Sequence, residues 1–218
     1  MAGLLDQLVQ EFAAPVLNEH GYVPQSNREF SRSAPNGDLA FAAFAPVRGA
    51  AIRPAEVFQI KESILPTTKI SYTKYLYADS GNPWIGPRAS QGLYQRAVRP
   101  PLEFDVYRGE RISEVSWQWV LHPTEKLVSD AGPLLQSILK DDVLPRLDRL
   151  SDRGALLDEL RSGVARAVTG LRVGEILLIV DDGESAELDA LIAADLANSR
   201  GGESAIADWT ALRLGGSD

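Results

Sequence analysis

The sequence predicts an α+β protein in which a mostly antiparallel sheet of five or six strands is packed by an N-terminal helix and by C-terminal helices. Apolar residues recur at helical spacing near both ends of the 218-residue chain. Between these ends the composition is typical of strands, because all six tyrosines lie between Tyr22 and Tyr107 and five of the six phenylalanines between Phe30 and Phe104. Aromatic and β-branched residues favour pleated surfaces.

The first expected element is an amphipathic helix. Pro15 lies inside its pattern and predicts a kink or a division into two pieces. Gly21 is a suitable C-terminal cap, after which Tyr22 begins the next segment. The apolar positions of this helix are Leu4, Leu5, Leu8, Val9, Phe12, Val16 and Leu17.

Strands are expected next, and the turn between the first two is predicted by Pro35-Asn36-Gly37-Asp38. The segment 79–99 is rich in turn-forming residues, so we expect a long loop, in which residues 89–97 could instead form a short helix. The candidate strands are Arg28–Arg32, Leu39–Ala45, Val57–Leu65, Ile70–Tyr77, Leu102–Tyr107 and Ile112–Leu121.

After Pro123 the pattern is helical again, with a break expected at Pro145. Ser151 or Asp152 can cap the following helix. Leu134, Leu135, Ile138, Leu139, Val143 and Leu144 are the apolar positions before the break.

The last part of the chain allows two interpretations. Residues 174–181 have the composition of a strand, and short apolar runs cannot be assigned by periodicity alone. However, Asp182-Gly183 followed by Ser185 has the pattern of a helix stop and a new cap, so we favour a helical hairpin. We predict an α+β domain over residues 1–170 and a helical extension packed on it over residues 171–218.

The chain is acidic, with a formal net charge of −8. Residues 181–218 contain nine Asp or Glu and two Arg, a net of −7, so the acidity belongs to the extension. A basic partner surface or plain solubility explains this charge, and solubility is the simpler explanation. An acidic protein repels phosphate backbones, so nucleic acid is not an expected partner.

The absence of cysteine excludes disulfides and thiolate chemistry. The N-terminal residues lack the pattern of a signal peptide, and no apolar run is long enough to cross a bilayer, so we expect a cytoplasmic protein without membrane contact.

Signatures of catalysis are missing. The chain contains no Gly-x-Ser-x-Gly elbow, no His-Glu-x-x-His and no Walker A loop, so we expect no metal and no cofactor. Of the two histidines, His20 precedes a helix-ending glycine, where a structural role is expected. If the protein is an enzyme, His122 is the candidate general base.

Polar and aromatic side chains of the predicted sheet are the candidate ligand-binding residues. Trp117 and Trp119 are two apart in a predicted strand and should share a face, which is either the core face or an open recognition face. Gln59 and Lys61 should lie opposite Phe58 and Ile60. The full set is Arg28, Arg32, Gln59, Lys61, Tyr72, Trp84, Trp117 and Trp119.

Several short motifs resemble an uncharacterised bacterial family known as domain of unknown function 4304. They are Gly21-Tyr22 after a helix, Phe30-Ser31-Arg32, Trp117-Gln118-Trp119, Leu144-Pro145-Arg146-Leu147 and Ala155-Leu156-Leu157, within about residues 4–160. The family commonly has a Phe-Gln-Lys-Ser-like strand, whereas this chain has Phe58-Gln59-Ile60-Lys61-Glu62-Ser63. The resemblance implies the α+β fold and no catalytic residue.

Two functions lead the expectations, and a third, an oligomerising scaffold, stays open. The first is a non-enzymatic binding or accessory protein of the immunity or masking type, with another protein as its partner. The alternative is a small-ligand-binding protein or enzyme that holds a small polar ligand in a groove near Trp84, Trp117, Trp119 and His122.

Overall fold

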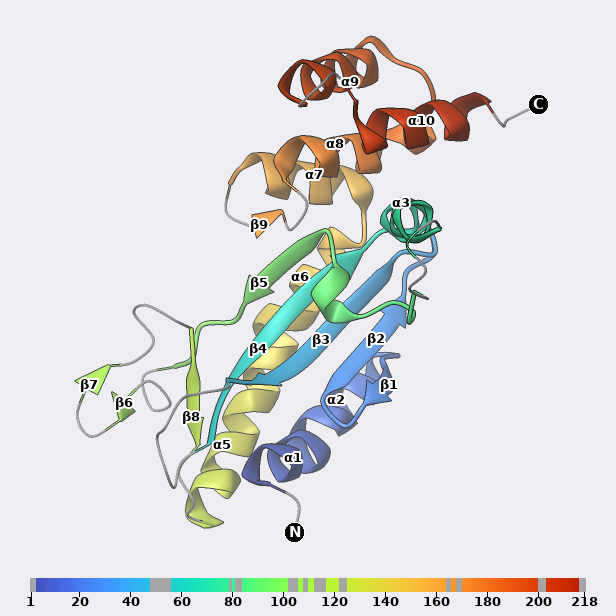
Figure 1. The fold of residues 1–218 in the computed structure, drawn as a ribbon. Coiled ribbons are helices and arrows are strands. Elements are labelled where there is room, and N and C mark those ends of the chain that lie inside the picture. Colours follow the sequence, from blue (N-terminus) through green and yellow to red (C-terminus); the bar gives the residue numbers. More distant parts are fainter. Residues whose placement is uncertain are drawn as a thin grey trace.

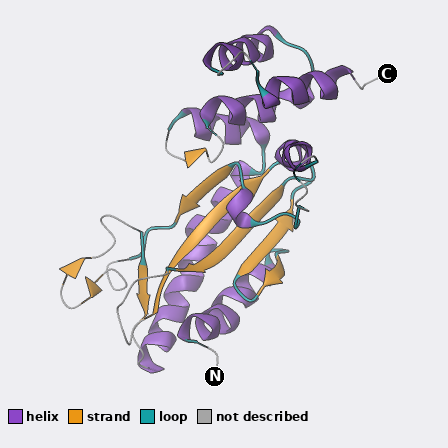
Figure 2. Ribbon diagram, in the orientation of Figure 1, coloured by secondary structure: helices purple, strands orange, loops and turns teal. Residues whose placement is uncertain are grey.

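The α+β prediction is confirmed by the computed structural model (Figures 1 and 2). Helices flank one antiparallel sheet, and further helices follow it at the end of the molecule away from the N-terminus. The structure describes residues 3–47, 56–78, 80, 84–101, 106–107, 110–111, 117–121, 125–163, 166–167, 170–199 and 203–215.

The central sheet has the order β1-β2-β3-β4-β5-β9, and β8 also pairs with β4. Every pair of neighbouring strands is antiparallel. Two strands pair with the same edge of β4: β8 pairs with Glu56–Phe58, and β5 pairs with Lys61–Ile64. The strands are β1 Val23–Ser26, β2 Glu29–Ser33, β3 Leu39–Pro46, β4 Glu56–Leu65, β5 Tyr94–Ala97, β8 Trp119–Leu121 and β9 Arg166–Ala167; β6 Val106–Tyr107 and β7 Glu110–Arg111 form a separate ribbon.

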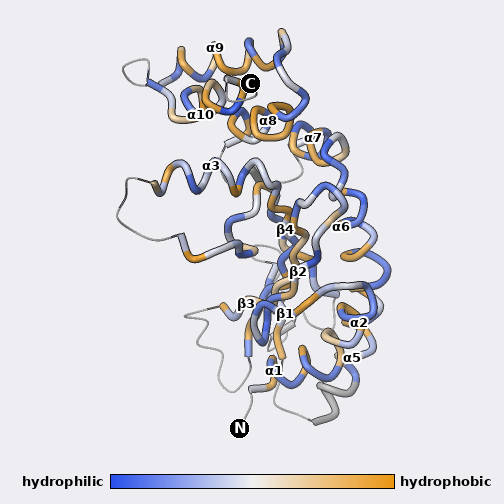
Figure 3. The backbone as a smooth tube through the Cα atoms, turned by 90° about the vertical axis from the view of Figure 1, so that its right-hand side faces the viewer, coloured by the Kyte–Doolittle hydropathy of each residue, from blue (hydrophilic) through white to orange (hydrophobic). Residues whose placement is uncertain are grey.

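One face of the sheet, which we call the inner face, is covered by two long helical segments (Figure 3). The first runs through α1 Leu4–Leu8, the π-helical turn η1 Val9–Ala13 and α2 Ala14–Glu19. The second runs through α5 Glu125–Ile138, the π-helical turn η4 Leu139–Val143 and α6 Leu144–Leu150. The buried strand residues beneath them include Phe30, Ala40, Ala42, Phe44, Phe58, Ile60, Ile64, Tyr94 and Trp119.

Both helical segments contain a proline two residues after the π-helical turn ends. Pro15 and Pro145 each occupy the second position of the α-helix that follows. In a straight α-helix each ring would meet the carbonyl four residues earlier, and the wider turn relieves that contact. The helices also approach closely, because a Cβ on Gly132 would lie 2.1 Å from the Phe12 ring, and Gln136 donates to the Phe12 carbonyl.

The opposite face, which we call the outer face, has lighter cover. It is contacted by α3 Thr67–Tyr77 and by the segment 84–93, which includes the short helix η2 Ala89–Gln91 in front of β3 and β4 (Figure 1). Side chains fix this segment, because Ser63 and Gln95 both donate to the Ala89 carbonyl. Gly92 is required here, since a Cβ would lie 1.7 Å from the Ser63 hydroxyl.

The C-terminal helices pack against the end of the sheet through α3 and α7 Arg153–Arg161. The favoured helical hairpin is present: Ser185 caps the second of its two helices by accepting from the Leu188 amide. Trp209 packs edge-on against Tyr72, with ring centroids 5.6 Å apart. The elements are α8 Leu171–Ile179, η5 Val180–Asp182, α9 Ala186–Asn198 and α10 Ala205–Gly215.

Asp38 joins these parts. Its buried carboxylate accepts from the Thr67 amide at the start of α3 and from Nε and Nη2 of Arg153 at 3.0 and 2.9 Å. Arg153 also donates to Asp181 of η5, and Asp181 in turn pairs with Arg213 of α10. The β2–β3 turn therefore anchors α3, α7 and the extension together.

Two predicted strands are wrong in part or entirely. Ile70–Tyr77 belongs to helix α3, because the distant Asp38 caps its first turn and Tyr72 packs on Trp209, and these tertiary contacts override the strand propensity. Within the described part of Ile112–Leu121, only Trp119–Leu121 is a strand. Trp117 precedes it with a φ of 51°, which interrupts the alternation, so the two tryptophans do not share a face.

Other boundaries differ less. The possible helix over residues 89–97 is only the turn η2, followed by strand β5. Of the predicted strand Leu102–Tyr107, only Val106–Tyr107 is described, and it is a strand. None of the helices within the described ranges is long and apolar enough to cross a membrane.

Candidate functional site

The predicted ligand-binding residues do not gather in one place. Trp119 lies in the core, where its Nε1 donates to the Val98 carbonyl at 3.1 Å and its ring packs against Phe58. Tyr72 is buried against Trp209. These two aromatic residues hold the fold together, so their positions favour the core alternative for Trp119.

The two predicted arginines are already engaged. Arg28 pairs with Asp6 of α1 at 2.6 Å, which lowers the pKa of the Asp6 carboxyl. Arg32 pairs with Asp148 of α6 and lies over the Tyr22 ring, 4.9 Å from its centroid. Both arginines therefore tie the β1–β2 region to helices of the inner face.

The remaining predicted residues are more accessible. Gln59 and Lys61 are half-buried on the outer face of β4, as the alternation predicts. The Lys74 Nζ lies over the Trp84 ring, 5.2 Å from the ring centroid. Trp117 is 39% exposed. His122 lies outside the described residues, so its predicted role stays a prediction.

A groove of about 480 Å³ opens on the outer face. Both polar and apolar residues line it, and Gln25 donates to Ser31 across the β1–β2 pair at 2.8 Å. Of the residues that the sequence predicts to bind a ligand, Arg32 lines this groove. The groove is lined by Gly21, Val23, Gln25, Ser31, Arg32, Ser33, Leu39, Phe41 and Pro87, from β1, β2, β3 and the segment 84–93.

One exposed apolar side chain lines this groove, and another is close to it in the sequence. Val23, which lines it, is 56% exposed, and Ile85, two residues before the lining residue Pro87, is 68% exposed. Phe41, which also lines the groove, is buried. An apolar floor with polar side chains beside it is typical of a binding surface.

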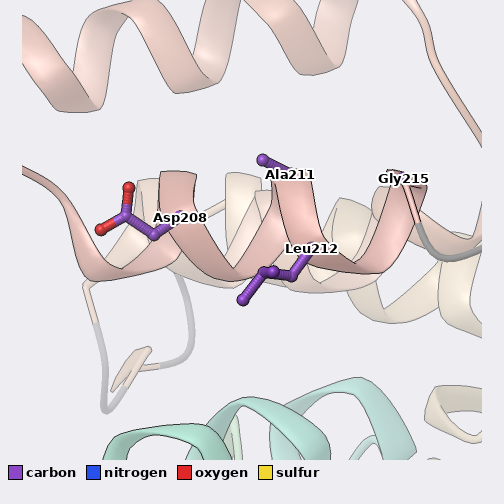
Figure 4. Close-up of a pocket in the computed structure, with 4 residues that line it drawn as sticks. All are labelled: Asp208, Ala211, Leu212 and Gly215. Carbon is purple, nitrogen blue, oxygen red and sulfur yellow. The ribbon is translucent and has the colours of Figure 1, made fainter.

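A second groove, of about 610 Å³, lies along α10 and is lined by Asp208, Ala211, Leu212 and Gly215. Figure 4 shows that these residues all belong to one helix and that Ala211 and Leu212 leave it in different directions. The side chains do not converge on a common point, so this hollow is a weaker candidate than the outer-face groove.

The structure also reveals a buried polar cluster that the sequence analysis missed. Glu62 of β4 is completely buried on the inner face, and burial raises the pKa of its carboxyl to about 8. Tyr94 and Arg96 of β5 and Arg146 of α6 surround it. The sequence contains a signal for this buried charge, because Glu62 is spaced by even numbers of residues from Phe58, Ile60 and Ile64 and so shares their face of the strand.

Within the described ranges, no group of three or more His, Asp or Glu residues could hold a metal ion. Comparisons with family models, with curated proteins and with solved structures found no match to this chain. The resemblance to domain of unknown function 4304 therefore stays a prediction.

Proposed function

We propose that this protein is a non-enzymatic binding protein that holds a protein partner against the outer face of its sheet. The observation that carries the proposal is the outer-face groove together with the exposed Val23 and Ile85. An apolar side chain of a partner would enter above Phe41 and Leu39, while Gln25 and the neighbouring serines bond its main chain. Such a buried apolar anchor inside a polar rim is the arrangement of protein-binding hot spots.

The contacts of Arg32 support a protein partner over a small anionic ligand. This residue lines the groove, but by alternation its side chain starts from the inner face of the sheet. Arg32 already contacts Asp148 and the Tyr22 ring, so its charge is compensated within the chain. Affinity would then depend on buried apolar contact and shape rather than on charge. The alternative groove near Trp84, Trp117, Trp119 and His122 has less support, because Trp119 belongs to the core.

The test is photo-crosslinking from two positions of similar exposure. A photoreactive residue replaces Ile85 beside the groove or Leu212 on α10, which are 68% and 65% exposed, and each protein is added to an extract of its native host. We expect a discrete crosslinked protein from position 85, none from position 212, and loss of the product when Val23→Glu is introduced. Equal products from both positions, or a product that survives Val23→Glu, would overturn the proposal.

A small ligand would give a different result. Native mass spectrometry of the protein recovered from the same extract should then show a retained small molecule and no crosslinked protein. That outcome would replace the protein-binding proposal with the ligand-binding alternative.

A further inference from the structure

Glu62 is an ionisable group on an otherwise apolar face. In β4 it alternates in phase with Phe58, Ile60 and Ile64, all of which belong to the core, and its own side chain is 0% exposed. Burying an ionised carboxylate is costly unless it is paired and hydrogen-bonded. The protonation state of Glu62 therefore depends on how α6 and β5 pack around its side chain.

The contacts of this carboxyl come from two sides. From α6, Arg146 Nε lies 3.3 Å from Oε2 without hydrogen-bond geometry, while Arg146 Nη2 bonds to Asp142 of η4. From β5, the Tyr94 hydroxyl donates to Oε2 at 3.4 Å. Arg96 is the residue directly opposite Glu62 in the β4–β5 register, so its side chain starts from the same face.

Four polar atoms of the cluster have no hydrogen-bond partner within the part of the chain that the structure describes. They are Glu62 Oε1, Arg96 Nη1, Arg146 Nε and the Tyr22 hydroxyl oxygen, and all four are buried. Buried polar atoms are nearly always paired, so a spare acceptor beside several spare donors indicates a cluster with a second way to arrange its bonds.

The charged and titratable groups around Glu62 act in opposite directions. Burial dominates and raises its pKa to about 8, the charges of Asp142 in η4 and Glu159 in α7 raise it further, and Arg96 and the Tyr94 hydroxyl lower it. Tyr22, which follows α2, faces the same cluster, and its own burial raises the pKa of its hydroxyl. Arg146 completes the set.

We propose that the Glu62 carboxyl is a proton-operated latch between β5 and the η4–α6 helix. In the protonated form Glu62 fits the buried face as a neutral group and Arg96 Nη1 stays without a partner. Loss of the proton places a negative charge between two guanidinium groups, which draws Arg96 toward Oε1 and changes how β5 is held against α6. This device is independent of the proposed partner binding.

The sign of the pH effect follows from linkage. The folded-state pKa of Glu62, about 8, lies above its ordinary value of 4.5. The folded state therefore binds this proton more tightly, and the resulting stability is fully present below about pH 4.5 and is lost as the pH rises toward 8. Ionisation therefore destabilises the folded state, because the attraction of Arg96 offsets only part of the cost of burying the charge, and the seam between β5 and α6 should open more readily.

Carboxyl-carbon NMR of the intact protein tests the latch directly. We expect one Glu signal to titrate near pH 8 and to disappear in Glu62→Gln. Asp142→Asn should move that titration to lower pH and Arg96→Gln to higher pH, since these residues shift it in opposite directions. Titration near 4.5, or equal movement in both variants, would overturn the proposal.

Hydrogen exchange supplies the structural readout. After correction for the chemical exchange rate, amides of residues 94–97 and 139–150 should exchange at least about threefold faster at pH 9 than at pH 6 in the wild type. Glu62→Gln should remove that difference. An unchanged difference in Glu62→Gln would contradict the latch, and if this variant does not fold, the wild-type titration still decides the matter.

Discussion

The two faces of the sheet differ in how they are covered. On the inner face, large apolar side chains such as Phe58 and Trp119 meet two helical segments that contain π-helical turns. On the outer face, the segment 84–93 is held by side-chain hydrogen bonds, because Ser63 and Gln95 both donate to the Ala89 carbonyl. This difference indicates that most of the stability lies on the inner face, and the outer face is the one that we propose to bind a partner.

The largest expected effect is on the inner face. Trp119→Ala removes a buried ring and should lower the free energy of unfolding by about 4 kcal/mol, as measured by urea denaturation. Trp117→Ala is the matched control, because that ring is 39% exposed, and it should change stability by less than about 0.5 kcal/mol. Similar losses in the two variants would break the comparison.

The junction between the sheet and the extension should rank second. Asp38→Ala removes the acceptor of the Thr67 amide and of two Arg153 hydrogen bonds, although Arg153 keeps Asp181, and should cost about 3 kcal/mol in the same assay. Adding Arg153→Ala should cost clearly less than the sum of the single losses, because the two residues share one interaction. Strict additivity would show that the observed contact is not energetically coupled.

A smaller loss is expected where the outer cover meets the sheet. Gly92→Ala places a methyl group 1.7 Å from the Ser63 hydroxyl and should cost about 2 kcal/mol, because the segment 84–93 must shift. Gly215→Ala is the control, since no atom lies within 4 Å of its added Cβ. If Gly92→Ala were neutral in thermal unfolding, the segment would be held more loosely than its hydrogen bonds indicate.

The smallest stability effect is expected at the rim of the groove. Val23→Glu adds a charge at a side chain that is more than half exposed, so the free energy of unfolding should change by less than about 0.5 kcal/mol. Partner crosslinking should nevertheless be lost. A destabilisation of 2 kcal/mol or more would place Val23 in the core and remove it from the binding surface.

Much of this fold could be predicted from local pattern. The apolar run of residues 39–45 matches β3, the alternation in residues 58–61 matches β4, and the stop-and-cap pattern at Asp182-Gly183 and Ser185 correctly favours the helical hairpin. Helix α3 could not be predicted in this way, because its cap comes from Asp38, 29 residues earlier in the chain. Such a contact has no signal in the sequence next to the helix.

The candidate site was less predictable than the fold. The chemistry of Arg32 and Tyr72 predicts contacts with a ligand, but ion pairing and ring packing give them structural contacts. The groove depends on Pro87 lying near β1–β3, a long-range placement that periodicity does not encode. Glu62 could have been found, since a charged residue in phase with apolar neighbours predicts a buried charge.

Hydrogen exchange of the purified complex with its crosslinked partner tests the central claim most directly. If the outer face is the binding surface, the complex should protect amides in residues 23–33 and 84–93, while residues 171–199 and 203–215 exchange as in the free protein. Protection confined to the C-terminal helices, with residues 23–33 unchanged, would contradict the account.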